Sequence, residues 1–318
     1  MFSRIIGTGS YLPEKIVTNQ DFEEKLDTSN EWIIERSGIE SRRVANSNEF
    51  ASDMASEAAK KAMGKAGVGP NDIDLIIVAT TTPDMVFPST ACILQSKLGV
   101  KTCIAFDMQA VCTGFVYSLN MADLFIKSGQ ASKALVVGAE VYSRILDYTD
   151  RSTCVLFGDG AGAVVLSESS EPGLISSKLH ANGQYKDFLS VPGWLRNGKS
   201  SGSPYVQMNG PAVFKFAVKA FVDVSKETLN SAKRSTSDVD WFIPHQANTR
   251  IMDAAIGKLK INKEKLVSTV KHHGNTSAAS IPLALDEYVD RKLIKKGDNI
   301  LLAGVGGGFT WGGIFLTF

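Results

Sequence analysis

Cysteine is scarce in this chain, and the few cysteines are not spaced for a metal or a disulfide framework. Only four occur among 318 residues: Cys92, Cys103, Cys112 and Cys154. No two of them have CxxC spacing, which argues against a zinc site. Sparse cysteine usage is typical of the reducing cytosol and not of small secreted domains held by disulfides. We therefore expect no metal centre and no disulfide framework.

Excess charge and long apolar runs are also lacking. The formal net charge is +1, so the composition gives no sign of a nucleic-acid partner. No apolar run approaches the roughly 18 residues that cross a membrane, and the first residues lack the apolar core of a signal peptide. Hydrophobic residues make up 44% of the chain, which is ample for a core, and the length suggests about two domains. We expect a soluble, cytoplasmic protein that binds neither membrane nor nucleic acid.

What the sequence does contain is an internal repeat. Residues 71–76 resemble residues 237–242, and residues 133–138 resemble residues 299–304, both at an offset of 166. Each of these predicted strands follows a predicted helix; the helices are expected at 51–67 and 212–233 for the first pair and at 113–128 and 279–294 for the second. Equal spacing at two separate elements indicates duplication of a helix–strand unit. We predict an α/β fold of two halves, residues 1–170 and 171–318, related by a pseudo-two-fold axis.

A cysteine stands at the start of the most apolar predicted helix. An apolar run at 103–106 stops at Asp107, and a helix that is apolar nearly all round begins near Cys112, which indicates burial. Unpaired N–H groups and the helix dipole favour an anion there, so we expect the pKa of the Cys112 thiol to fall below about 8.5, as for a nucleophile. The alternative is an inert structural cysteine. At the offset of 166 Cys112 corresponds to Ala278, so the starts of the two central helices should face each other.

Further polar motifs lie in the second half. His245 ends a predicted strand, the end at which open α/β sheets bind ligands; the alternative is a hydrogen-bonded loop residue. Asn275 lies in the segment 272–277, which is either part of a site or a plain turn and helix cap. The glycine run at 304–308 lets backbone N–H groups approach a reacting atom; a nucleotide-binding loop is the weaker interpretation, because no GxGxxG follows. Residues 157–163 are expected to form a structural turn.

The order Cys112, His245, Asn275 does not by itself define a reaction. Papain-like proteases have the same Cys…His…Asn order with broadly similar spacing. They differ in their secretory or lysosomal context and in the Cys-Gly-Ser-Cys-Trp neighbourhood of the nucleophile, neither of which is present here.

With these motifs in place, the whole sequence resembles β-ketoacyl-acyl carrier protein synthase III of the thiolase superfamily, the initiating condensing enzyme of type II fatty acid synthesis. The resemblance is carried by residues 7–13, 28–33, 87–89, 111–115, 157–162, 244–248, 273–280 and 306–312. It implies a thiolase-like, duplicated five-layer αβαβα sandwich, which agrees with the repeat.

The resemblance also implies an acyltransferase mechanism. Acetyl-CoA acylates Cys112, CoA leaves, and malonyl-acyl carrier protein loses CO₂ and attacks the acyl-cysteine to give acetoacetyl-acyl carrier protein. The CoA thioester is a substrate, so no cofactor is expected. His245 and Asn275 would donate hydrogen bonds to the enolate oxygen, since an amide cannot act as a base. The N–H groups of Cys112 and Gly307 would form the oxyanion hole.

Substrate and partner contacts follow from the same resemblance. The residues matching CoA-binding positions are Thr28, Trp32, Arg36, Arg151, Gly210, Phe214, Ala247 and Asn248. Those matching the dock for acidic acyl carrier protein are Gln246, Arg250, Lys215, Lys219 and Lys258. Phe87 matches the residue that closes the acyl pocket of the partner subunit in a homodimer. The alternative for Trp32 is a core aromatic, and the alternative for the lysines is an ordinary solvated face. Thr28 and Glu31 have the form of a capping box, which predicts that a short helix carrying Trp32 begins there.

Other functions differ in the residues that they require. A thiolase needs a second catalytic cysteine near the C-terminus, and none follows Cys154. Elongating synthases usually present two histidines where this chain has His245 and Asn275. A related condensing enzyme could use another acyl-CoA primer or serve specialised metabolism. A cysteine thioester hydrolase and a non-catalytic binder of CoA or carrier protein are the alternatives from other classes.

Overall fold

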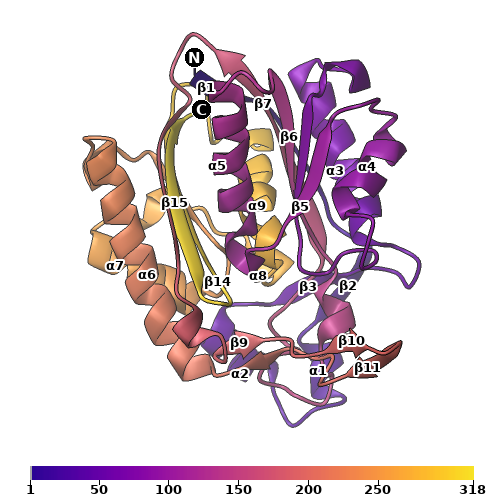
Figure 1. Ribbon diagram of the computed structural model, residues 1–318. Coiled ribbons are helices and arrows are strands. Elements are labelled where there is room, and N and C mark those ends of the chain that lie inside the picture. The colour runs from indigo at the N-terminus through magenta and orange to yellow at the C-terminus, as the bar shows by residue number, and fades with distance from the viewer. Residues whose placement is uncertain (1) are drawn as a thin grey trace.

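The computed structural model describes residues 2–318, and two mixed sheets form its frame (Figure 1). The first has strand order β1-β7-β6-β4-β5. Its strands are β1 (Phe2–Tyr11), β4 (Leu75–Ala79), β5 (Ile104–Met108), β6 (Lys133–Glu140) and β7 (Gly160–Ser169). The second has the order β13-β14-β15-β8. Its strands are β8 (Leu174–Ala181), β13 (Trp241–Pro244), β14 (Asn299–Gly306) and β15 (Thr310–Thr317). In the first sheet β4 pairs in parallel with both β5 and β6, and in the second sheet β13 pairs in parallel with β14.

Helices cover both sheets and fill the space between them (Figure 1). They are α3 (Ala51–Ala66), α4 (Thr90–Leu98), α5 (Gly114–Lys127), α6 (Gly210–Ser231), α7 (Thr249–Leu259) and α9 (Ser280–Asp290). Helices α5 and α9 share one buried cluster with the facing sides of both sheets. Helices α3 and α4 pack on the outer face of the first sheet, and α6 and α7 on that of the second. The predicted five-layer αβαβα sandwich is confirmed.

The predicted duplication appears in the element boundaries. Strands β6 and β14 are displaced by 166 residues at both ends, and α5 and α9 begin 166 residues apart. The turns that precede these helices, η2 (Val111–Thr113) and η7 (Ser277–Ala279), have the same displacement. The division of the chain at residue 170 stays a prediction, because both halves contribute to one central layer.

Shorter elements lie across one end of the sandwich (Figure 1). They are α1 (Gln20–Glu23), α2 (Asn30–Ser37), α8 (Val270–His273), β2 (Lys15–Thr18), β3 (Ser41–Val44), β9 (Leu189–Ser190), β10 (Trp194–Arg196), β11 (Lys199–Ser201) and β12 (Gln207–Met208). Helix α2 corrects one expectation, since its N-cap is Ser29, whose side chain accepts from Trp32 N, and not Thr28. Within residues 2–318, no helix has both the length and the apolar character needed to cross a membrane.

Candidate active site

The two helix starts meet as the repeat predicts. Cys112 lies in η2, directly before α5, and η7 stands in the equivalent place before α9. Val111 and Ser277 occupy equivalent positions, and both adopt left-handed backbone angles, with φ of 50° and 49°. Glycines in the central strands make room for these turns: a Cβ on Gly138 would lie 2.3 Å from the Ala278 carbonyl oxygen. The side chains of both halves therefore converge on one place.

His245 follows β13 and is buried, with only 3% of its surface exposed. Its Nδ1 lies 2.7 Å from Ser280 Oγ, which also accepts a hydrogen bond of 3.2 Å from Gln246 N. The Ser280 hydroxyl proton can then be donated to Nδ1, which favours the tautomer with its proton on Nε2. Burial lowers the pKa of His245 to about 3. At neutral pH this histidine is an uncharged N–H donor.

Asn275 is held by the segment that contains Phe157. The two residues form a parallel bridge, Asn275 N donates to Leu156 O at 2.9 Å, and Gly158 N donates to Asn275 O at 3.0 Å. The side-chain Oδ1 accepts from Ser277 N at 2.9 Å, so the NH₂ group is the part that can serve a substrate. The expectation of a structural turn at 157–163 is therefore corrected: residues 160–163 belong to β7, and the residues just before this strand position Asn275.

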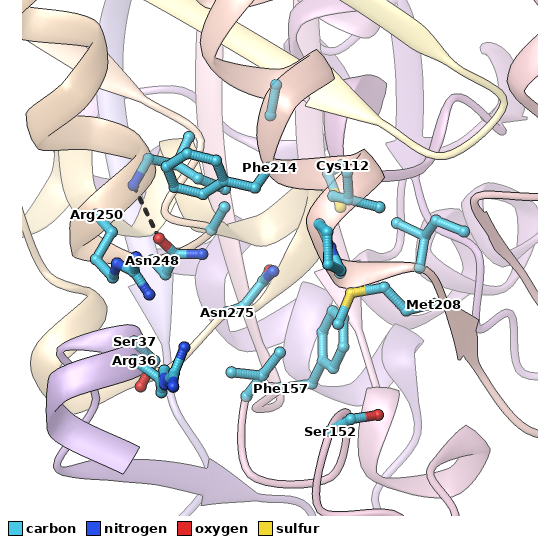
Figure 2. A pocket seen from close by; sticks show the side chains of 18 of the residues that line it. Arg36, Ser37, Cys112, Ser152, Phe157, Met208, Phe214, Asn248, Arg250 and Asn275 are labelled. Carbon is cyan, nitrogen blue, oxygen red and sulfur yellow. Dashed lines mark hydrogen bonds between the residues drawn. The ribbon is translucent and has the colours of Figure 1, made fainter. Parts of the chain in front are cut away.

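A cavity of about 930 Å³ joins these residues to the surface. Cys112, His245 and Asn275 line it together. Figure 2 shows that Phe214, Asn248 and Arg250 come from one side, and Phe157 and Met208 from the other. The structure thus brings all three predicted catalytic residues to a single space.

Burial sets the state of the nucleophile. It raises the pKa of the Cys112 thiol to about 12; a hydrogen bond from Ser277 opposes this rise, and the Glu140 carboxyl adds to it. The expected lowering of this pKa by the helix start is therefore wrong. Cys112 is a neutral thiol at neutral pH and must lose its proton as it attacks.

The glycine run passes beside the nucleophile. A Cβ on Gly306 would lie 2.8 Å from Cys112 N and from Ala110 O, so only glycine allows this approach. Gly307 comes next and faces Leu189 O, 2.8 Å from where its Cβ would be. The oxyanion hole of the Cys112 and Gly307 N–H groups remains a prediction.

The surface end of the cavity is aromatic and cationic. Trp32, Arg36 and Arg151 line it. The guanidinium carbons of Arg36 and Arg151 lie 5.9 Å and 5.1 Å from the centre of the Trp32 ring, within cation–π range. Thr28 is not among the lining residues; its Oγ1 is buried and makes no hydrogen bond to the residues described.

The middle of the cavity is lined by four residues that the resemblance singled out: Gly210, Phe214, Ala247 and Asn248. Asn248 caps α7 by accepting a hydrogen bond of 2.9 Å from Ile251 N (Figure 2), which leaves its NH₂ group for a ligand. Arg250 lies over Phe214, with 5.7 Å between the guanidinium carbon and the ring centre.

Sequence reasoning missed part of the lining. The additional apolar residues include Leu189, Met208, Phe221, Val305 and Phe309. Leu189 and Met208 lie in strands of two residues, which are too short to show a period of two. Phe221 lies in α6 and Val305 in β14, where the hydrophobic pattern predicts a buried side chain. The pattern does not show whether a buried side chain lines a cavity or packs in the core.

The predicted carrier-protein residues divide into two groups. Lys215 and Lys219 are exposed on α6, and Arg250 and Lys258 are exposed on α7, which packs beside α6. Gln246 is fully buried. Its amide nitrogen donates to Pro244 O at 2.7 Å and its oxygen accepts from Thr269 N at 2.8 Å. Its expected contact with a carrier protein is therefore corrected: Gln246 braces the loop that carries His245.

Phe87 lies away from the cavity of its own chain. It is not among the lining residues, and 82% of its surface is exposed. The neighbouring Met85 and Val86 are exposed as well. Its predicted role in the pocket of a second subunit remains a prediction.

Comparisons with known proteins agree with this geometry. Residues 106–183 match the model of the family described as 3-oxoacyl-[acyl-carrier-protein (ACP)] synthase III, and residues 229–318 match its C-terminal model. The beta-ketoacyl-[acyl-carrier-protein] synthase III of Neisseria meningitidis serogroup A is 55% identical over 318 residues, which is 100% of this chain and 99% of that protein.

Solved structures show the same likeness. The 3-oxoacyl-[acyl-carrier-protein] synthase III of Aquifex aeolicus is 46% identical, with a TM-score of 0.95 over 99% of this chain and 100% of that one. The enzyme of Pseudomonas aeruginosa is 39% identical, with a TM-score of 0.94 over 100% of this chain and 98% of that one. With full-length similarity in sequence and fold, this chain belongs to the β-ketoacyl-acyl carrier protein synthase III family.

Proposed function

We propose that this enzyme transfers a short acyl group such as acetyl from CoA to Cys112 and then joins it to malonyl-acyl carrier protein. Membership of the family makes the chain an acyltransferase, the condensing enzyme that initiates type II fatty acid synthesis. The observation that supports acyl transfer through Cys112 is that Cys112, His245 and Asn275 line one cavity, whose surface end is aromatic and cationic.

Acylation comes first. The Cys112 sulfur attacks the thioester carbonyl of acyl-CoA, and the N–H groups of Cys112 and Gly307 stabilise the tetrahedral oxyanion. Each such donor typically lowers the barrier by about 3 kcal/mol. The intermediate collapses to an acyl-cysteine and CoA thiolate, and the proton that the Cys112 thiol releases to solvent is balanced by the one that the CoA thiolate takes up.

Decarboxylation and condensation follow. The thioester oxygen of the malonyl group accepts hydrogen bonds from His245 Nε2–H and the Asn275 NH₂ group, so that negative charge moves onto it as CO₂ leaves. The resulting carbanion attacks the acyl-cysteine carbonyl, and the carbon–sulfur bond breaks. A histidine whose pKa is held to about 3 by burial suits this role, because as a base it would activate a hydrolytic water poorly.

The cavity mouth suits a nucleotide. We assign Trp32 to the adenine ring, and Arg36 and Arg151 to the phosphate end of CoA, where guanidinium groups bind phosphate oxygens. Gly210, Phe214, Ala247 and Asn248 then border the narrow pantetheine arm, whose amide carbonyls can accept from the Asn248 NH₂ group.

The exposed cations beside the mouth suit an acidic carrier protein. We assign Lys215, Arg250 and Lys258 to this dock, together with Lys219, which pairs with Asp223. Asp253 on α7 weakens the positive field locally, although Lys263 lies 3.2 Å from it. Because long-range charge attraction is screened by salt, the KM for the carrier-bound substrate should rise with ionic strength.

A condensation assay tests the proposal. The enzyme is mixed with malonyl-acyl carrier protein and a panel of acyl-CoA primers, and products are identified by mass spectrometry. We expect acetoacetyl-acyl carrier protein with acetyl-CoA, and no acyl-enzyme in Cys112→Ser. Undiminished labelling of that variant by radiolabelled acetyl-CoA, or rapid release of free acid without condensation, would overturn the assignment.

A further inference from the structure

The amide of Asn275 can face a substrate in two ways, and only one of them supplies a donor. The side chain lines the same cavity as Cys112 (Figure 2). With its NH₂ group toward the substrate it stabilises a developing negative charge; in the reversed orientation it presents its oxygen, which repels that charge. The last torsion of an asparagine side chain is roughly two-fold, so by itself it does not choose between the two. A neighbouring group must select the orientation.

The backbone N–H of Ser277 makes this selection. It donates to Asn275 Oδ1 at 2.9 Å. In the reversed orientation the Asn275 NH₂ group would face this N–H, donor against donor. Both residues are buried, and a buried N–H without an acceptor is destabilising. The amide therefore keeps its orientation as long as the Ser277 N–H keeps its direction.

The direction of the Ser277 N–H depends on an unfavourable backbone conformation. Its φ of 49° lies in the left-handed region, where the Cβ of a residue crowds the following carbonyl oxygen. The turn η7 is three residues long, and so short a helical turn is not stable by itself. A contact from outside η7 is needed to hold Ser277 in this conformation.

Glu140 supplies this contact from the other half of the chain. Its Oε1 accepts from Ser277 Oγ at 3.0 Å. The carboxyl is itself fixed at the end of β6, because its Oε2 accepts from Thr81 N at 3.0 Å and from Thr82 Oγ1 at 2.6 Å. Glu140 is fully buried, and a buried carboxyl with several donors is held in one geometry. The first sheet thus holds the hydroxyl of a turn that belongs to the second half.

The internal repeat shows that this contact is particular to η7. At the offset of 166 Glu140 is equivalent to Gly306. Gly306 lies directly against η2, where its Cβ would be 2.8 Å from Cys112 N. Ser277 is equivalent to Val111, which has φ of 50° but no hydroxyl to bond. The turn of the nucleophile is therefore backed by main chain, whereas η7 is held by a carboxyl side chain.

From this chain of contacts we infer that Glu140 is a positioning residue for decarboxylation, an inference that rests on the proposed function. Glu140 holds the Ser277 hydroxyl, and the held turn aims the Ser277 N–H at Asn275 Oδ1. The amide then presents its NH₂ group to the malonyl thioester oxygen. In this role Glu140 and Ser277 exchange no proton and touch no reacting atom. Decarboxylation should respond to both residues only while Asn275 is present.

Two variants at Ser277 separate positioning from chemistry by the hydroxyl itself. Release of CO₂ from malonyl-acyl carrier protein is measured in a Cys112→Ala background. We expect Ser277→Ala, which keeps a Cβ at positive φ without its anchor, to slow this release by about tenfold or more, since loss of a whole donor typically costs about 10²–10³-fold. Ser277→Gly also removes the hydroxyl, but glycine adopts positive φ freely, so it should recover much of the rate. Equal losses in both variants would overturn the inference.

A double-mutant cycle tests whether the effect passes through Asn275. In an Asn275→Ala background, Ser277→Ala should change decarboxylation by less than about twofold, because no amide is left to orient. With Asn275 present, Ser277→Ala should lower kcat and leave the KM for malonyl-acyl carrier protein within about twofold, because the lost interaction is made in the transition state. An undiminished effect of Ser277→Ala without Asn275 would contradict positioning.

Glu140→Gln completes the test. An amide has one acceptor oxygen where the carboxyl has two, so decarboxylation should slow, and Glu140→Gln with Ser277→Ala should cost no more than Ser277→Ala alone. Acetylation of Cys112 does not use Asn275 and should fall by a smaller factor in each variant.

Melting temperatures show which variants are folded; if Glu140→Gln is not, the Ser277 and Asn275 variants decide alone. Additive losses at Glu140 and Ser277, or equal losses in both half-reactions, would overturn the inference. A full rate of decarboxylation in Asn275→Ala would instead overturn the proposed function, on which the inference rests.

Discussion

At the scale of single residues, burial leaves the reactive groups uncharged. The pKa of Cys112 is raised to about 12 and that of His245 is lowered to about 3, so at neutral pH one is a thiol and the other a neutral imidazole. Charge therefore appears in the cavity only as bonds are made and broken. Fixed donors such as His245 Nε2–H then act on developing charge with little reorganisation.

The lowered pKa of His245 leads to a prediction about the pH dependence of decarboxylation. A histidine with a folded-state pKa of about 3 stays neutral from pH 5.5 to 8, because it would gain its proton only well below pH 5. Decarboxylation of malonyl-acyl carrier protein by Cys112→Ala should therefore be flat over this range. Release of CO₂ measured at stepwise pH checks this. A loss of rate with a midpoint near pH 6.5, the ordinary value, would show that His245 titrates normally.

At the scale of elements, glycines in the central strands set the distance between the halves. Gly138 in β6 and Gly304 in β14 are equivalent by the repeat, and each lies against the turn of the opposite half. A side chain at either place would push η2 and η7 apart. The contact between helix starts thus depends on the absence of a Cβ in the strands beside them.

Gly138→Ala tests this spacing. Its Cβ would lie 2.3 Å from Ala278 O, a backbone atom that cannot turn away, so we expect a loss of about 1–3 kcal/mol in the free energy of unfolding and reduced acetylation of Cys112. Gly64→Ala in α3 is the matched control, because a Cβ there meets nothing within 4 Å and alanine favours a helix by about 0.5–1 kcal/mol. The free energies of unfolding of both variants are measured with denaturant. A Gly138→Ala variant as stable as the wild type would contradict the interpretation.

At the scale of the whole molecule, the segment at 85–87 presents apolar side chains to solvent. Phe87 is 82% exposed, beside Met85 and Val86, and β5 forms an open edge of the first sheet. Exposed apolar groups on this scale mark interaction sites, and an open strand edge can pair with another chain. We propose that two copies associate here, and that Phe87 enters the acyl pocket of the other subunit and restricts it to short primers.

Sedimentation equilibrium tests this association. We expect the wild type to have the mass of two chains, and Phe87→Glu to shift toward one, because a charge would be buried without a partner. Phe2→Glu is the control, since Phe2 is exposed on β1, at the opposite edge of the same sheet. A single-chain mass for the wild type, or equal dissociation of both variants, would contradict the proposed interface.

The sequence by itself determined the duplication, implied the sandwich through its resemblance to a known family, and singled out Cys112, His245 and Asn275, which line the cavity together. Hydrophobic periodicity and the offset of 166 can be read from the order of residues along the chain, because neither depends on which distant segments are in contact. Only the tertiary structure decided the surroundings of single residues: it raised the pKa of Cys112, enclosed Gln246, placed Thr28 outside the cavity and brought the Ser277 hydroxyl within hydrogen-bond distance of Glu140. Solvation depends on contacts between distant segments, and these contacts exist only after the two halves have packed together.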